Sequence, residues 1–444
     1  IVGGHPPFDL WEVDIRRMQP HQNRKTYLRE RVSEALGLTY AMHWPFRQFE
    51  TARGVRRTPL YHRLKENGAC FGEVAGWERP NWFAAAGEAP AYWYSFRRQN
   101  WFHHVAAEAK ATREQVGLLD QSTMAKFLVR GADAERALQR ISATDMAVQP
   151  GRAVYTQWLN ERGGIEADLT VTRLTGDSYL VVTAAATAVR DLQWLRRHVD
   201  GDARVTIEDV TGAYAVLGVM GPNSRTFLQS LSEDDFSNEA FPFGRSKNVA
   251  IGAAPVRATR ISYVGELGWE LYVPSEFAIG VFDQLMEVGR AHGLRLCGMH
   301  AMDSLRLEKA YRHWGHDITD EDTPLEAGLG FAIAFGKAIP FIGRDALLRQ
   351  REAKVLPKRL LQFALDNPEP LLYHNEPIYR NGRLVGATSS AGYGHYLGRA
   401  IALGYVSDAG GITAEFVADG EWEIEVGFVR HAARASLKPM YDPT

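Results

Sequence analysis

Two carboxylates stand inside strand-like runs whose other residues are mostly apolar. Asp168 lies in the run I-E-A-D-L-T-V, and Glu270 lies in G-W-E-L-Y-V. A carboxylate in such a run must be solvated, paired or used in chemistry. It can accept a proton from a reacting group, or two parallel hydrogen bonds from an amidine-like N–H pair such as the edge of a pterin or guanine. For either residue alone, a solvent-facing strand position is the commoner explanation.

A glycine-containing turn and a tyrosine accompany each carboxylate. The extended run that begins at Tyr155 reaches a turn at 160–164, and the strand with Asp168 follows. Tyr263 precedes a second glycine-containing turn ahead of Glu270. Glycine tolerates the positive φ that tight turns need. We therefore expect each carboxylate to lie on a strand that follows such a turn.

An α/β pattern begins near residue 105 and runs twice. A strand that ends in Gly131 leads into a helix, and so does a strand that ends in Gly221. Thr-Arg-aliphatic triplets follow at Thr172 and Thr259, each ahead of another strand and helix. This repetition predicts two related α+β subdomains, which would form a cleft between them.

Three other stretches differ in composition from these repeats. Residues 1–58 open with a turn-like run at 3–7 and contain a predicted exposed helix at 23–36, but they are too polar to build a core. Residues 59–104 are rich in aromatic residues and glycine, which predicts an irregular, well-packed segment. Beyond residue 345, strand-like runs predict a small antiparallel barrel or sandwich. These runs are 360–363, 378–379, 401–406, 413–417 and 422–429.

The composition is that of a globular protein without a strong charge bias. The 444 residues are 45% hydrophobic and 23% charged, and the formal net charge is −2. This balance gives no electrostatic argument for nucleic acid or a membrane surface, and no apolar run approaches the ~18 residues of a spanning helix. Cys70 and Cys297 are the two cysteines, which suits a reducing compartment and a buried thiol at Cys70. The chain begins with Ile1, as expected of a fragment or a processed product.

Other candidate motifs do not have the required spacing. His300, His313 and His316 lie near two aspartates, but the sequence contains no H-E-x-x-H or paired C-x-x-C, so we predict no metal site. The glycines at 392–398 fall short of G-x-G-x-x-G and lie in the region predicted to be β-structure. A dinucleotide fingerprint belongs at the strand-to-helix turn of a βαβ unit. The chain therefore shows no FAD-binding motif of its own.

Several blocks resemble known families, and together they cover essentially the whole chain. The blocks from Tyr155 to Asp168 and from Tyr263 to Glu270 resemble the aminomethyltransferase (glycine-cleavage T-protein) family. Three further blocks resemble the C-terminal half of the dimethylglycine/sarcosine dehydrogenase (or oxidase) family. They are the opening G-G-H-P-P-F-D-L-W-E-V-D-I-R-R, residues 57–83, and T-S-S-A-G-Y-G-H-Y-L-G-R-A-I-A-L-G-Y-V at 388–406. In that family an FAD-dependent amine-oxidising half precedes this region.

The resemblance implies a particular domain organisation. The expected fold class is α+β, in a multidomain cloverleaf-like arrangement of two related α+β subdomains plus a C-terminal antiparallel β-barrel or jelly-roll-like domain. Residues 1–58 would be the trailing segment of the FAD-dependent amine oxidoreductase half. Residues 59–344 would form the folate-binding aminomethyltransferase-like region, and residues 345–444 the barrel.

The resemblance also implies a reduced-folate site. Glu270 would hold the N–H edge of the pterin, Tyr263 would line its pocket, and Tyr155 would contact the folate. Backbone groups near Val182 would add further pterin contacts. Asp168 would lie where the folate amines meet the one-carbon donor, because a nitrogen that attacks an iminium carbon gains positive charge and must lose a proton.

Two positions near the end of the second subdomain bear on this assignment. Trp314 corresponds to a T-protein aromatic residue and would stack on the aryl ring of the folate. T-proteins carry an A-R-D segment where this chain has Ala301-Met302-Asp303, so their arginine contact is missing. This departure favours the dehydrogenase-like branch.

The leading interpretation is a tetrahydrofolate-binding module that captures the one-carbon unit from oxidative N-demethylation of a methylated glycine-type amine and forms 5,10-methylenetetrahydrofolate. FAD is expected only in a missing N-terminal half, which would be the protein partner, and a homo-oligomer is compatible with the sequence. The alternatives are a stand-alone folate-dependent demethylase or aminomethyltransferase, and a non-catalytic folate-binding scaffold domain. We expect a cytoplasmic protein, or one of the mitochondrial matrix if the source is eukaryotic.

Overall fold

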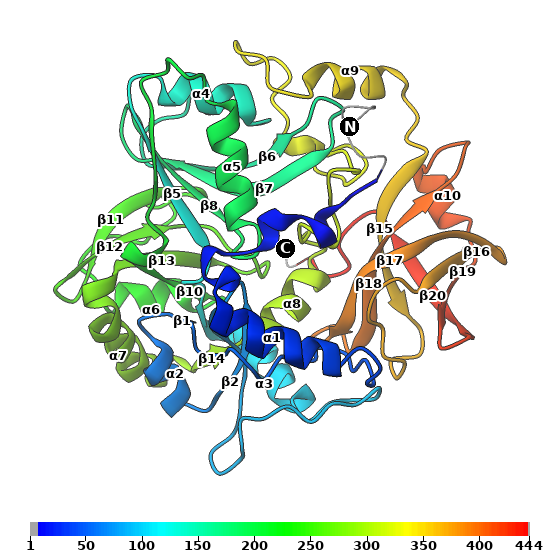
Figure 1. Cartoon of the computed structure of the whole chain (residues 1–444), viewed down its shortest axis with the longest axis horizontal. Coiled ribbons are helices and arrows are strands. Elements are labelled where there is room, and N and C mark those ends of the chain that lie inside the picture. Colours follow the sequence, from blue (N-terminus) through cyan, green and yellow to red (C-terminus); the bar gives the residue numbers. More distant parts are fainter. Residues whose placement is uncertain (1–7, 443–444) are drawn as a thin grey trace.

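The computed structural model describes residues 8–442, so the turn expected at 3–7 lies outside the described residues. Figure 1 shows two sheet-and-helix units on the left, a β-barrel on the right, and helix α8 (Met299–Glu308) between them. The first residues of the described chain form a further layer in front of these units. This arrangement confirms the expected α+β class with two subdomains and a C-terminal barrel.

The two subdomains contain sheets of corresponding topology. The first sheet has the order β6-β7-β8-β5-β9, and the second has the order β11-β12-β13-β10-β4-β14. The strands of the first are β5 (Ala125–Arg130), β6 (Arg152–Leu159), β7 (Ile165–Arg173), β8 (Ser178–Thr183) and β9 (Thr206–Asp209). Those of the second are β4 (Val116–Asp120), β10 (Tyr214–Met220), β11 (Ser246–Ile251), β12 (Ala254–Thr259), β13 (Gly268–Pro274) and β14 (Leu294–Cys297).

Equivalent glycines confirm that the subdomains are related. Gly131 directly follows β5 with φ of 135°, and Gly221 directly follows β10 with φ of 132°. A Cβ atom added at Gly131 would lie 1.9 Å from the carbonyl oxygen of Arg204, and one at Gly221 would lie 2.3 Å from that of Gln115. Both turns therefore require the absence of a side chain, and the same conformation recurs at the same place in each repeat.

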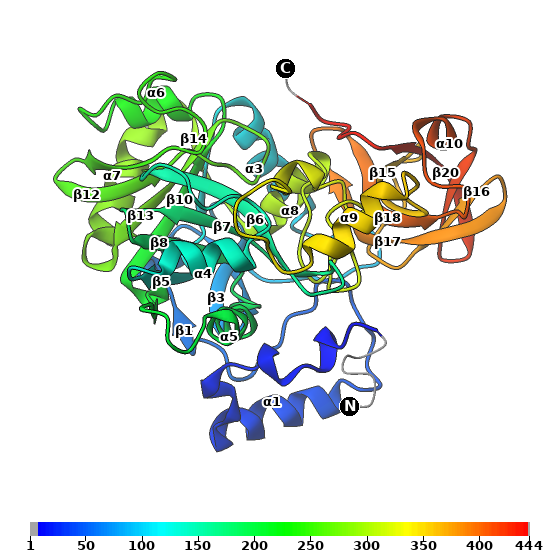
Figure 2. The same cartoon turned by 90° about the horizontal axis from the view of Figure 1, so that it is seen from above.

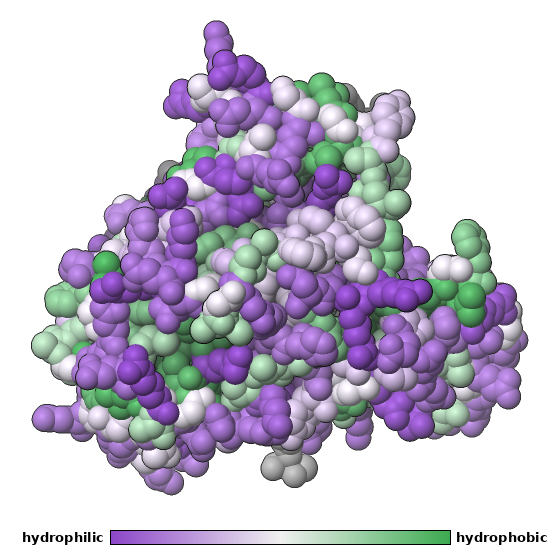
Figure 3. Space-filling view, turned by 90° about the horizontal axis from the view of Figure 1, so that it is seen from below, coloured by the Kyte–Doolittle hydropathy of each residue, from purple (hydrophilic) through white to green (hydrophobic). Residues whose placement is uncertain are grey.

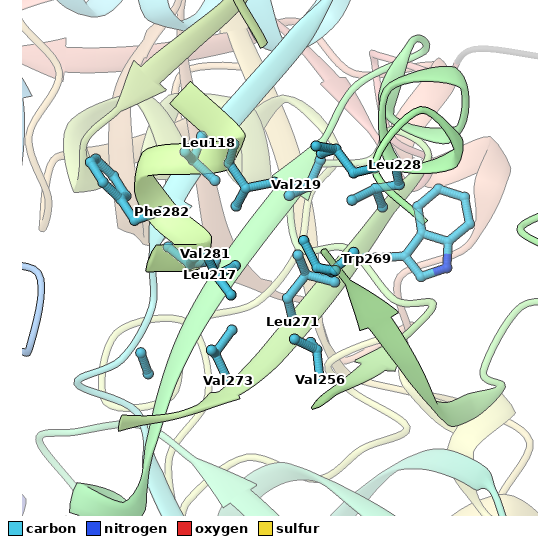
Figure 4. Packing of buried hydrophobic residues seen from close by; sticks show 14 of the residues in the cluster. Leu118, Leu217, Val219, Leu228, Val256, Trp269, Leu271, Val273, Val281 and Phe282 are labelled. Atoms are coloured by element: carbon cyan, nitrogen blue, oxygen red, sulfur yellow. The ribbon is translucent and has the colours of Figure 1, made fainter. Parts of the chain in front are cut away.

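Helices cover the outer face of each sheet. They are α4 (Ala134–Ile141) and α5 (Ala188–His198) on the first sheet, and α6 (Ser224–Gln229) and α7 (Ala278–Gly289) on the second. Alternate strand residues point toward these helices, as the twofold periodicity of a strand requires. Figure 4 shows this packing for β10, β13 and α7, with Leu217, Val219, Leu271, Val273, Val281 and Phe282. The intervening residues must therefore face the other side of each sheet.

The C-terminal domain is a closed barrel in the order β15-β18-β17-β16-β19-β20. Its strands are β15 (Lys358–Leu365), β16 (Pro377–Arg380), β17 (Arg383–Gly394), β18 (Arg399–Ser407), β19 (Trp422–Val426) and β20 (Val429–Ser436), and α9 (Arg344–Glu352) precedes it. The strand expected at 413–417 is wrong, because these residues form helix α10 (Ala414–Ala418). The Thr413 hydroxyl accepts a hydrogen bond from the Phe416 amide at 3.1 Å and caps this helix.

The aromatic stretch at 59–104 is more regular than expected. It contains α2 (Tyr61–Glu66), β2 (Ala69–Val74), β3 (Trp77–Phe83) and the start of α3 (Phe102–Glu114). Strands β2 and β3 form a hairpin whose turn uses positive φ at Ala75 (49°) and Gly76 (79°), and β1 (Arg56–Arg57) pairs with β3. Residues 84–101 contain no helix or strand, so the prediction holds only for that part.

The N-terminal layer projects from the rest of the molecule. It contains short 3-10 turns and helix α1 (Lys25–Gly37), which has no buried residue and confirms the predicted exposed helix (Figure 2). The layer projects at the top of Figure 3, where hydrophobic side chains lie among hydrophilic ones. Val13 is 78% exposed and Ile15 is 83% exposed. The layer leaves apolar surface uncovered in this chain.

Candidate functional site

The two sheets face each other through their inner surfaces. Leu180 and Val182 of β8 pack against Val216 of β10 and Tyr272 of β13 in one cluster. Val182, predicted to contribute backbone contacts, is 2% exposed at this junction. Polar side chains that share these strand faces are therefore directed between the subdomains, as the predicted cleft requires.

Asp168 belongs to the inner face of the first sheet. Its neighbours Ala167 and Leu169 lie in the outer-face core, so Asp168 faces the opposite side. Gln157 is its directly opposed partner on β6, and the Gln157 Nε2 donates to an Asp168 carboxylate oxygen at 2.8 Å. Burial is the largest influence on this carboxyl group and raises its pKa to about 6, although Tyr155, Gln157 and Arg312 favour the charged form. Such a group can change protonation near neutral pH.

Tyr155 lies beside Asp168 on the same face. It opposes Thr170 in the register of β6 and β7, two residues along from Asp168. Burial raises the pKa of Tyr155 well above its ordinary value, and the Asp168 charge raises it further. The phenol therefore remains protonated and available as a donor. The ring of Phe331, 79% exposed, stacks near the Tyr155 ring with centroids 6.2 Å apart.

Glu270 occupies the inner face of the second sheet. Its carboxylate is 5% exposed and accepts a hydrogen bond from the Tyr272 hydroxyl at 2.7 Å. Burial raises the pKa of Glu270, and the Tyr272 hydroxyl and Lys126 partly offset this effect. Gly218 is its directly opposed partner on β10 and has no side chain of its own to lie over the carboxylate.

An unpaired acceptor lies next to Glu270. The Gln121 Oε1 is buried and has no hydrogen-bond partner among the described residues. It lies 2.6 Å from the position of a Cβ added at Gly218, which opposes Glu270. A buried acceptor without a partner is costly unless a bound molecule donates to it. The carboxylate and this amide oxygen together suit a ligand that presents several N–H groups.

Lys126 is a member of the site that the sequence analysis missed. It is fully buried, opposes Val182 across β5 and β8, and donates from Nζ to the carbonyl oxygens of Ser122 and Met124 at 2.9 and 2.8 Å. Burial lowers its pKa to about 8, and the charges of Asp120, Asp209 and Glu270 oppose that shift. A lysine inside an apolar strand, K in A-K-F-L-V-R, was the signal that could have identified it.

Tyr263 lies in the segment between β12 and β13. Its hydroxyl donates to the carbonyl oxygen of Arg312 at 2.5 Å, and its ring stacks on Tyr311 with centroids 5.7 Å apart. Burial raises the pKa of Tyr263, and the charges of Arg306, Asp168 and Asp303 also act on it. Tyr263 thus contacts the segment that follows helix α8.

Trp314 is largely buried, so little of its ring is open for stacking. It is 8% exposed, and its indole Nε1 donates to the carbonyl oxygen of Ile165 at 2.9 Å. The Arg190 guanidinium lies 4.3 Å from the ring centroid, and Trp11 of the N-terminal layer packs edge-on at 5.0 Å. Its stacking on a ligand stays a prediction. In this chain it joins the N-terminal layer to the start of β7.

The other residues and motifs considered in the sequence analysis are Cys70, the glycines at 392–398 and the histidines. The thiol of Cys70 is buried, as predicted, and burial raises its pKa to about 12. The glycines at 392–398 lie on β17 and its turn to β18, which is an antiparallel hairpin. Within residues 8–442, no group of three His, Cys, Asp or Glu side chains could hold a metal ion. No helix in that range is both long and apolar enough to cross a bilayer.

Comparison with protein families identifies three matching regions. Residues 60–337 match the GCVT N-terminal domain, and residues 358–442 match the glycine cleavage T-protein C-terminal barrel domain. Residues 3–58 match the FAD dependent oxidoreductase central domain. The first match contains all of the predicted site residues, Tyr155, Asp168, Val182, Tyr263, Glu270 and Trp314.

Two relatives are similar over the whole chain. The chain is 45% identical over 443 residues to the 4-methylaminobutanoate oxidase (formaldehyde-forming) of Paenarthrobacter nicotinovorans, covering 100% of this chain and 53% of that protein. It is 36% identical over 484 residues to the mitochondrial sarcosine dehydrogenase of Homo sapiens, covering 100% of this chain and 52% of that protein. The chain therefore spans about half the length of these relatives.

A solved structure shares the fold. The glycine cleavage system aminomethyltransferase T from Bartonella henselae matches with a TM-score of 0.74 and 26% sequence identity. The match covers 88% of this chain and 99% of that one. The arrangement of two subdomains and a barrel is thus that of a complete aminomethyltransferase.

Proposed function

The chain belongs to the GCVT N-terminal domain family, and from that membership we propose that it binds a reduced folate and transfers a one-carbon unit to it. It is an aminomethyltransferase-like domain related to methylamine-oxidising enzymes. The observation that carries the proposal is the pair of carboxylates, Asp168 and Glu270, on facing sheets of the two subdomains. One carboxylate can recognise the ligand while the other acts on it.

Recognition is assigned to the second sheet. The Glu270 carboxylate and the Gln121 amide oxygen both accept hydrogen bonds, and a pterin ring presents adjacent N–H groups on one edge. Lys126 contributes a positive charge on the opposite face, which favours the ionised form of Glu270. Tyr263 lines the same region, and the backbone near Val182 supplies further polar groups.

Proton transfer is assigned to the first sheet. Tetrahydrofolate supplies the nucleophilic amines that accept the one-carbon unit. Asp168, with a pKa of about 6, is largely ionised at neutral pH and can stabilise positive charge on a folate nitrogen and accept its proton. Gln157 fixes one carboxylate oxygen, and the protonated Tyr155 helps to orient the group. Such proton transfer typically contributes about 10²–10⁴-fold in rate.

The proposed partner and product are inferred from the fact that this chain spans about half the length of its relatives. We propose that residues 1–58 are the trailing part of an FAD-dependent amine-oxidising half, and that the exposed apolar side chains of the N-terminal layer pack against it. That half would oxidise an N-methyl amine, and this half would convert the released carbon to 5,10-methylenetetrahydrofolate. Trp11, which contacts Trp314, would then connect the two halves.

The test is a titration of this chain with 5-formyltetrahydrofolate, followed by quenching of tryptophan emission. We expect micromolar binding, equivalent to about −8 kcal/mol, and a loss of affinity in Glu270→Gln. Glu276→Gln, an exposed glutamate of the same subdomain, is the matched control and should bind like the wild type. If the wild type does not bind, a scaffolding domain that does not use folate replaces this proposal, whereas binding without transfer would indicate the non-catalytic folate-binding domain. Methylene transfer by this chain without any flavin would instead favour the stand-alone demethylase.

A further inference from the structure

A cavity lies between helix α8, the aromatic segment and the barrel. Its volume is about 320 Å³, and it is lined from six parts of the chain. The residues that matter here are Phe46, Arg79, Trp101, His300, Asp303 and Tyr373. Small-molecule sites span about 300–1,000 Å³, so this cavity lies at the lower end of that range and suits a compact ligand. None of the folate-site residues discussed above lines it.

Arg79 of β3 faces this cavity without a direct hydrogen bond or ion pair among the described residues, although the charge of Asp303 acts on it. Within residues 8–442, no carboxylate forms an ion pair with its guanidinium, and no group accepts a hydrogen bond from its side chain. The neighbouring Arg306, which lines the same cavity, is occupied, since it pairs with Asp317 at 2.7 Å. A planar guanidinium that faces a cavity offers two parallel donors, the geometry that a carboxylate accepts.

The opposite charge comes from Asp303 on α8. Its side chain is 52% exposed, although it lines the same cavity, and its nearest ion-pair contact is the Arg306 Nε at 3.4 Å. Burial raises the pKa of Asp303, but Arg306, His313 and Arg79 outweigh that effect and hold the pKa below its ordinary value. Asp303 therefore stays ionised and has free surface for a cation.

Aromatic rings complete the wall. His300 stacks on Trp101 with centroids 5.5 Å apart, and Phe46 packs edge-on against both His300 (5.2 Å) and Tyr373 (5.3 Å). Aromatic faces attract organic cations. Phe46 also has φ of 63°, a conformation that bulky residues rarely adopt and that the surrounding packing must maintain.

We propose that this cavity binds a small zwitterion, an amino acid whose carboxylate meets Arg79 and whose ammonium group meets Asp303 and the aromatic wall. Zwitterion binding at this cavity does not depend on the proposed folate site, because the two sites share no lining residue.

The experiment is a calorimetric titration of the whole chain, without folate, with three probes. Sarcosine carries both charges, propionate carries only the carboxylate, and N-methylglycinamide carries only the cation. We expect sarcosine to bind at least about tenfold more tightly than either single-charge probe. Arg79→Gln should weaken sarcosine and propionate about tenfold or more and leave N-methylglycinamide unchanged, and Asp303→Asn should weaken sarcosine and N-methylglycinamide instead.

Arg63→Gln is the matched control, because Arg63 is an exposed arginine that pairs with Asp283 outside the cavity. It should bind all three probes like the wild type. Equal affinity of the wild type for sarcosine and propionate overturns the proposal, and so does unchanged sarcosine binding in a folded Arg79→Gln. The wild-type probe series decides the question even if a variant fails to fold. A folate titration with Glu270→Gln is read separately, so failure of one site does not imply failure of the other.

Discussion

Gln157 and Asp168 face each other directly across β6 and β7, with the amide nitrogen 2.8 Å from the carboxylate oxygen. This contact fixes the direction of a carboxylate that the alternation of β7 already turns toward the inner face of the sheet. It also favours the ionised form against the effect of burial, which raises the pKa to about 6. The position of Asp168 and its protonation are therefore linked through one neighbour.

Asp168→Asn should lower the rate of one-carbon transfer by about 10²–10⁴-fold. The amide has nearly the same shape, so binding of 5-formyltetrahydrofolate should remain within a few-fold of the wild type. The rate is measured as formation of 5,10-methylenetetrahydrofolate by the protein that includes its flavin-dependent half. A wild-type rate in Asp168→Asn would remove Asp168 from the chemistry.

Gln157→Leu should shift the pH dependence of transfer. In the wild type, the rate should rise as pH increases through about 6, because Asp168 must lose its proton to act as a base. Leucine removes a donor that favours the ionised form of Asp168, so the pKa of Asp168 rises. The increase of the transfer rate with pH should therefore occur at higher pH. The measurement is the rate between pH 5 and 8. If this increase occurs at the same pH in Gln157→Leu as in the wild type, another group controls the pH dependence of the rate.

Tyr272→Phe should weaken folate binding more at low pH than at high pH. It deletes the hydroxyl that donates to Glu270 at 2.7 Å, so the already raised pKa of Glu270 increases further. A protonated carboxyl group can no longer accept two hydrogen bonds from the ligand. Fluorescence titrations at pH 6 and 8 measure the change. Equal losses at both values would indicate a packing defect and not a change of charge.

Lys126→Met should alter the pH dependence of stability in one window. The folded-state pKa of Lys126 is about 8, against an ordinary value of 10.5, so the unfolded chain holds the extra proton between these values. The wild type should therefore gain up to about 3 kcal/mol relative to Lys126→Met as pH rises from 8 to 10.5. Urea unfolding of both proteins across this range tests the sign. A constant difference would mean that burial does not lower the pKa of Lys126 in the folded protein.

Gly131→Ala and Gly221→Ala should each destabilise the protein by at least about 1–3 kcal/mol. Both glycines have φ near 130°, and an added Cβ would collide with a carbonyl oxygen in each case. Gly280→Ala is the control, because a Cβ there meets open space in α7 and should stabilise the helix by up to about 1 kcal/mol. Thermal unfolding ranks the three variants. If Gly131→Ala and Gly221→Ala were as stable as Gly280→Ala, the two turns would not require glycine.

The sequence was most informative where local patterns and packing agree. Gly131 and Gly221, together with the two Thr-Arg triplets, predicted the repeated subdomains. The twofold alternation around Asp168 and Glu270 placed each carboxylate on a strand, but only the packing of the two sheets decided that both face inward. The charge of Lys126 was hidden because its partners, Ser122 and Met124, are backbone carbonyl groups that no motif records.

The errors have local causes. Residues 413–417 are apolar enough for a strand, but the Thr413 cap begins a helix there. The aromatic stretch conceals a hairpin, because a register shift between Cys70 and Phe71 and the proline at Pro80 disturb the alternation. The sequence did not identify Arg79 on that hairpin, because only the folded structure shows that its guanidinium has no ion pair or hydrogen bond among the described residues.

The corresponding topologies of the two sheets have a consequence for how the site could diverge. In the aligned repeats, Glu270 of β13 occupies the position of Leu180 in β8, while Asp168 stands on the neighbouring strand β7. A duplicated unit would begin with two equal walls, and any ligand between them could enter in either of two orientations. Here one wall has gained its carboxylate on one strand and the other wall on a different strand. The two walls are therefore not equivalent, and a ligand between them would meet a different carboxylate in each orientation.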